Sequence, residues 1–153
     1  MRSILVTALI LLVTAEPATF ASTTFTATIN GASNVPALAV PGTGAGTFVL
    51  NDAQTQLSYN IHFSGLLADE IAAHIHNAGA RDNGPAVFGL PLGSPKIGVW
   101  SIPAAMVTEL FASHLYVNIH SSLYVLGEIR GQIRLEVLPV EGATWGAVKA
   151  LYR

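Results

Sequence analysis

Cysteine is absent from the sequence, and charged residues make up only 10% of its 153 positions. Without cysteine the chain can form no disulfide, no thiolate metal site and no cysteine nucleophile. The formal net charge is −2, and the chain has no basic run or patch of the kind that binds nucleic acid. We therefore expect no nucleic-acid partner.

Several motifs of enzymes are also missing. The sequence has no Gly-x-Ser-x-Gly, no His-Glu-x-x-His and no glycine-rich phosphate loop of the expected spacing. These absences give no support to a hydrolase or a nucleotide-binding enzyme.

Residues 1–21 have the pattern of a secretory signal peptide. A short basic start, Met1-Arg2, precedes an apolar run from Ser3 to Ala15, and Thr19-Phe20-Ala21 is an acceptable cleavage site. The run is shorter than the roughly 20 apolar residues of a membrane anchor, and no later segment is long enough to span a bilayer. We expect a secreted or periplasmic chain, held by its core or by a bound metal because it lacks disulfides.

The body of the chain reads as a series of short strands separated by glycine- and proline-rich turns. Residues 56–63 alternate cleanly, with Leu57, Tyr59 and Ile61 on one face. The pattern predicts about eight short strands and one short helix, in an all-β antiparallel sandwich or barrel, Greek-key-like. The predicted strands cover residues 25–29, 46–50, 56–63, 72–76, 86–90, 96–102, 115–120 and 128–135, and the helix residues 104–113.

The chain divides into three parts. Residues 22–137 are predicted to form the single domain, after the signal peptide at 1–21. Residues 138–153 form a C-terminal extension, in which Trp145 lies in a pattern of helical spacing. This extension is interpreted as a short helix or a tail.

Histidines on two predicted strands point to a metal site. His74 and His76 are two residues apart, so both imidazoles lie on one face of their strand. His120 lies on the polar face of a second strand, with Tyr116 and Asn118. Neutral imidazole is a good ligand for copper and zinc, so we predict a site made by His74, His76 and His120, with His62 as a fourth candidate. The alternative is that these histidines only form hydrogen bonds within the sandwich.

The chain resembles the CHRD (chordin) domain family. The motifs that carry the resemblance are Ala73-His74-Ile75-His76, Tyr116-Val117-Asn118-Ile119-His120 and Gly127-Glu128-Ile129-Arg130-Gly131-Gln132, within residues 25–135. The family often has Pro-Gly where this chain has Val125-Leu126, so this turn is expected to be built differently. The resemblance implies a single-domain, exported protein of the bacterial type, whose biochemical role the domain match does not define.

Four polar residues near the histidines each have two interpretations. Glu128 can orient a ligand histidine, or it can form an exposed cross-strand ion pair with Arg130, which would contribute little stability. Tyr116 and Asn118 flank His120 on its face and can line the site or simply pack across strands.

Three functions follow as hypotheses. The preferred one is a binding protein with a histidine-based metal site, with copper favoured over zinc because a similar His-x-His lies on a β-sandwich strand of copper–zinc superoxide dismutases. The second is an interaction module for an extracellular protein or polysaccharide, with structural histidines. The third is a copper-dependent redox enzyme of the superoxide dismutase type.

Overall fold

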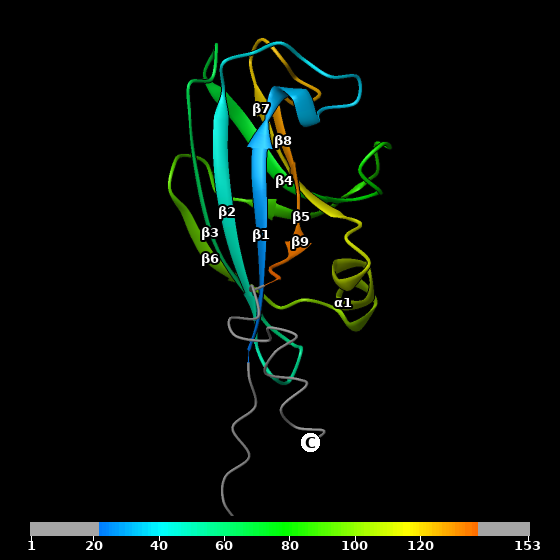
Figure 1. Cartoon of the computed structure of the whole chain (residues 1–153). Helices are drawn as coiled ribbons and strands as arrows, with labels where there is room; N and C mark the ends of the chain where they lie inside the picture. Colours follow the sequence, from blue (N-terminus) through cyan, green and yellow to red (C-terminus); the bar gives the residue numbers. More distant parts are fainter. Residues whose placement is uncertain (1–21, 138–153) are drawn as a thin grey trace, which may run out of the picture.

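The computed structural model describes residues 22–137, and the predicted signal peptide and C-terminal extension lie outside this range. The described part is built almost entirely from strands (Figure 1). In chain order the elements are β1 (Thr23–Asn30), the 3-10 helix η1 (Gly31–Ser33), β2 (Thr43–Leu50), β3 (Leu57–Ser64), β4 (Glu70–Asn77), β5 (Ala86–Leu90), β6 (Lys96–Trp100), α1 (Ala104–Phe111), β7 (Leu115–Ser121), β8 (Ile129–Gln132) and β9 (Arg134–Leu135).

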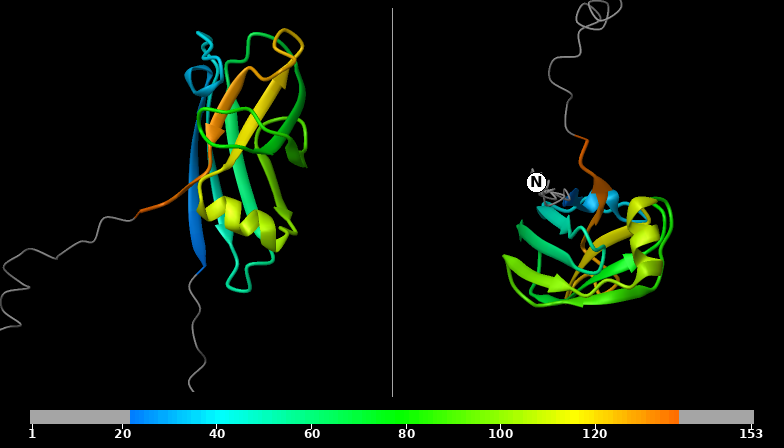
Figure 2. Two further views of the ribbon diagram at one scale, coloured as in Figure 1. Left: turned by 90° about the vertical axis from the view of Figure 1, so that its right-hand side faces the viewer. Right: turned by 90° about the horizontal axis from the view of Figure 1, so that it is seen from below.

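The strands form one antiparallel sheet that curls into a nearly closed barrel (Figure 2). The order is β5-β4-β7-β8-β1-β2-β3-β6, and β9 pairs with β1. The predicted all-β antiparallel fold with one helix is therefore confirmed. The sheet has 9 strands because the last predicted strand is divided at Ile133 into β8 and β9.

The barrel interior is filled by the apolar positions of the alternating strands. Along β3, Leu57, Tyr59 and Ile61 are buried and the residues between them are exposed, as their spacing predicts. β4 and β7 contribute Ile75 and Val117, both fully buried. Burying such a side chain stabilises the fold by about 1.5–3 kcal/mol, so this core can hold the domain without disulfides.

Side chains close the gap between the two edge strands, β5 and β6. Phe88 of β5 stacks on Trp100 of β6 with a distance of 4.9 Å between ring centroids. Lys96, the first residue of β6, is fully buried and bonds to Glu70 Oε1 at the start of β4 and to the Pro91 carbonyl, each at 2.5 Å. The edges are thus joined without a backbone ladder between them.

The helix α1 and the segment that contains η1 lie at opposite ends of the barrel. In Figure 1 the segment after β1, which contains η1, and the loop after β7 lie side by side at the upper end, and α1 lies at the lower end. Within residues 22–137, no helix is long and apolar enough to cross a membrane.

Candidate metal centre

Pairing of β4 with β7 brings the three predicted histidines together. Residues 73 and 75 of β4 face the core, so His74 and His76 lie on the outer face of the strand. In the antiparallel register, His74 is opposite Asn118 and Ala72 is opposite His120. His120 is therefore the diagonal neighbour of His74 on the same face, within reach of its side chain.

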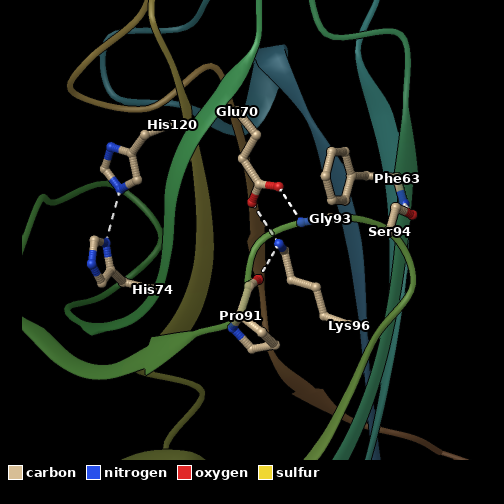
Figure 3. Close-up of polar contacts among 8 residues, drawn as sticks. All are labelled: Phe63, Glu70, His74, Pro91, Gly93, Ser94, Lys96 and His120. Carbon is tan, nitrogen blue, oxygen red and sulfur yellow. Dashed lines mark hydrogen bonds and ion pairs between the residues drawn. The ribbon is translucent and has the colours of Figure 1, made fainter.

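The ring nitrogens of these histidines converge. One nitrogen from each of His74, His76 and His120 can be chosen so that all three lie within 4.8 Å of one another. The Nδ1 atom of His74 lies 3.3 Å from Nε2 of His120 (Figure 3). Two nitrogens bound to one tetrahedral ion at 2.0–2.1 Å lie roughly 3.3 Å apart. This pair therefore already has the separation that a shared ion requires.

Backbone carbonyls fix the protonation of two of the rings. Nδ1 of His76 lies 2.9 Å from the Gly84 carbonyl oxygen, and Nδ1 of His120 lies 3.0 Å from that of Val125. A carbonyl can only accept, so each Nδ1 carries the proton and donates it. Each neutral ring therefore presents the lone pair of Nε2 to the cluster, which is the arrangement of metal-binding histidines.

The Nε2 atom of His76 has no hydrogen-bond partner although it is buried. Among residues 22–137, only two other buried side-chain atoms share this state, Asn118 Oδ1 and Glu128 Oε2. An unpaired buried acceptor costs about 1–3 kcal/mol. A bound cation would remove this cost at His76.

Burial favours the neutral form of the same two rings. It lowers the pKa of His76, against the opposing effect of the Gly84 hydrogen bond, and His74 and Arg130 lower it further. Burial also lowers the pKa of His120, and His74 and His76 add to that effect. Because a metal competes with protons for imidazole, a lowered pKa keeps both ligands available in mildly acidic solution.

Tyr116 of β7 and Arg130 of the adjoining strand β8 support the cluster. The Tyr116 ring stacks against His76, with 5.1 Å between ring centroids. The Arg130 guanidinium lies 3.6 Å from the centre of the Tyr116 ring. The Tyr116 hydroxyl accepts a hydrogen bond from the backbone N–H of Gly84. Tyr116 thus links His76 to the loop whose carbonyl orients it.

Asn118 lies among the histidines and is 6% exposed. Its Nδ2 donates to the Leu126 carbonyl, which leaves Oδ1 without a partner. A Cβ on Gly127 would clash with the Asn118 amide, and Gly127 has a φ of +120°. The turn that includes Val125-Leu126 therefore needs glycine next to it.

Glu128 and Arg130 have other roles than those predicted. Both are buried, 0% and 1% exposed, so they do not form the exposed ion pair considered for them. Glu128 Oε1 accepts from the Leu67 N–H instead of a histidine. Arg130 donates to the carbonyls of Gly79 and Asp82. Arg130 is buried because the loop between β4 and β5 folds over this face of β8.

His62 is not part of the cluster. It lies exposed on β3, a strand that pairs with β2 and β6 and not with β4 or β7. The polar strand face predicts His62 as a candidate metal ligand. That face belongs to β3, which lies in another part of the barrel from β4 and β7.

Sequence reasoning missed the groups that orient the rings. These groups are the backbone carbonyls of Gly84 and Val125. Every residue has a backbone carbonyl, so the residue types at these positions do not predict this role. The glycine at position 84 is one signal that the sequence contains. A Cβ at this position would clash with the Asn77 carbonyl. A glycine that closely follows the His-x-His strand can therefore mark a loop folded back onto that strand.

Comparison with known families agrees with the motifs around the histidines. The model of the CHRD domain matches residues 25–133, which run from within β1 to just past β8 and include all three histidines of the cluster. No curated protein and no solved structure matches the chain. Because the match covers well over half of the sequence, the chain belongs to the CHRD domain family.

Proposed function

We propose that this chain is an exported CHRD-domain binding protein that holds a transition-metal ion on His74, His76 and His120. The convergence of three ring nitrogens within 4.8 Å carries the proposal. The proposal also rests on the Nδ1–H tautomers of His76 and His120, which leave the Nε2 atom of each ring as an acceptor. Among residues 22–137, Nε2 of His76 has no partner, and Nε2 of His120 lies within hydrogen-bond distance of His74 Nδ1. The export of the chain is part of the proposal and depends on the leader at residues 1–21.

Copper is the ion that we expect in preference to zinc. Divalent copper binds a given set of nitrogen ligands more tightly than zinc does. Both ions accept imidazole, so the ligand set alone admits either one. The preference is therefore one of affinity, and a competition between the two ions measures it directly.

A redox enzyme of the superoxide dismutase type is the second candidate. Three protein ligands leave a coordination position open, as in catalytic metal sites, whereas a structural site is closed by four. A small substrate could then reach the ion. Copper-loaded protein without turnover of superoxide would exclude this candidate and leave metal binding in place.

The experiment is a thermal titration of the purified mature chain with copper or zinc. A ligand at about 100 times its Kd stabilises the folded state by about 2.7 kcal/mol, which raises Tm by on the order of 10 °C. We expect this rise in the wild-type chain and none after the triple change His74→Ala, His76→Ala and His120→Ala.

The matched control replaces the two remaining histidines, His62→Ala and His114→Ala, which lie outside the cluster. This variant should keep the full rise. No rise in the wild-type chain would reject the metal site. The histidines would then be structural, and an interaction module for a protein or polysaccharide would become the better description.

A further inference from the structure

A pocket of about 720 Å³ lies beside the histidine cluster. His76 and His120 form part of its wall, together with Tyr116 and Asn118. The volume falls within the range of about 300–1,000 Å³ that is usual for sites of small molecules. Two of the three proposed metal ligands therefore border a space that can hold an organic ligand.

One wall is an apolar loop that is fixed to the cluster. Leu123 and Val125 lie between β7 and β8, line the pocket, and are each 62% exposed. The Val125 carbonyl accepts from His120, and the next carbonyl, that of Leu126, accepts from Asn118. The loop thus directs its carbonyls to the strands and offers apolar side chains to the pocket.

A second wall is the segment after η1, which contributes Val35 and Leu38. Side-chain amides hold this segment in place: Asn83 Nδ2 donates to the Val35 carbonyl, and Asn34 Nδ2 donates to the Glu128 carbonyl, both at 2.7 Å. Both walls lie at the upper end of the barrel in Figure 1.

The strands line the pocket with polar side chains. The loops line it mostly with apolar ones, and they also contribute Asn34, Asn83 and Tyr124. Within residues 22–137, its lining includes no aspartate, glutamate, lysine or arginine. The polar side chains at the strand end are those of His76, Tyr116, Asn118 and His120. A ligand that suits this lining has an uncharged apolar body and one polar end.

We propose that the pocket binds a small amphiphilic molecule whose polar end supplies a donor atom to the metal and whose apolar body lies between the two loops. The inference rests on the proposed metal site, because the donor atom fills the position that three histidines leave open.

The test compares two ligands with the same donor nitrogen, 1-methylimidazole and 1-hexylimidazole, on the copper-loaded chain. Binding is followed by the visible absorption of copper. We expect 1-hexylimidazole to bind at least tenfold more tightly, since burial of about two methylene groups is enough for that factor. The double variant Leu38→Ser, Leu123→Ser should lose most of this advantage and keep the affinity for 1-methylimidazole, because both side chains line the pocket.

The matched control is Leu92→Ser, because Leu92 is 63% exposed and lies outside the pocket lining. It should leave both affinities unchanged. Equal affinities for the two ligands on a copper-loaded wild-type chain would overturn the pocket inference and leave the metal site standing. A chain that takes up no copper at the three histidines would overturn both.

Discussion

Replacing Lys96 with methionine is expected to lower the free energy of unfolding by about 3–5 kcal/mol. The Lys96 ammonium is fully buried and bonds to Glu70, whose side chain is 9% exposed (Figure 3). Without the lysine, a nearly buried carboxylate would keep only the Gly93 N–H as its partner among residues 22–137. Urea unfolding followed by circular dichroism measures the change.

The double variant Glu70→Gln, Lys96→Met distinguishes the effect of an unpaired buried charge from the effect of altered packing. Replacing a whole buried pair with uncharged residues is far less damaging than removing one partner, so we expect the double variant to recover most of the loss. A loss below about 1 kcal/mol in Lys96→Met would contradict this account, because such values belong to exposed pairs. The junction between the edge strands would then depend on Phe88 and Trp100 alone.

Replacing Arg130 with methionine is expected to cost about 3–6 kcal/mol of stability, because it removes two hydrogen bonds from a charged group, which contribute about 1.5–3 kcal/mol each. Arg130 donates to the Gly79 and Asp82 carbonyls in the loop between β4 and β5, and it stacks on Tyr116. The variant leaves these carbonyls without their donor. Urea unfolding is again the measurement.

Two further variants sharpen this prediction. Arg130→Lys keeps the charge but not the planar fork, so it should restore only part of the loss. Arg134→Met changes an exposed arginine four residues further on, and it should shift stability by no more than about 0.5 kcal/mol. Equal effects at positions 130 and 134 would mean that the contacts of Arg130 do not stabilise the loop.

The alternation of single strands predicted much of the fold. The pattern over residues 56–63 matches β3 to within one residue, and its apolar face is the buried one. The same rule placed His74 and His76 on one face, because side chains two apart on a strand always share it. These features depend only on neighbours in the sequence.

The rest of the site depends on contacts between distant segments. The pairing of His120 with Ala72 sets the geometry of the cluster, and no pattern within either strand specifies that register. Arg130 occupies a polar position of an alternating strand, which predicts an exposed side chain, yet loop carbonyls bury it. His62 satisfied the same polar-face rule and lies elsewhere, because that rule does not say which strands adjoin.

Elemental analysis of the mature protein, purified from the exported fraction, tests the metal site most directly. The account predicts about one copper or zinc ion per chain, as expected for a single three-histidine site, and none in the variant with His74, His76 and His120 replaced by alanine. A wild-type chain without metal, or a triple variant with as much metal as the wild type, would contradict it.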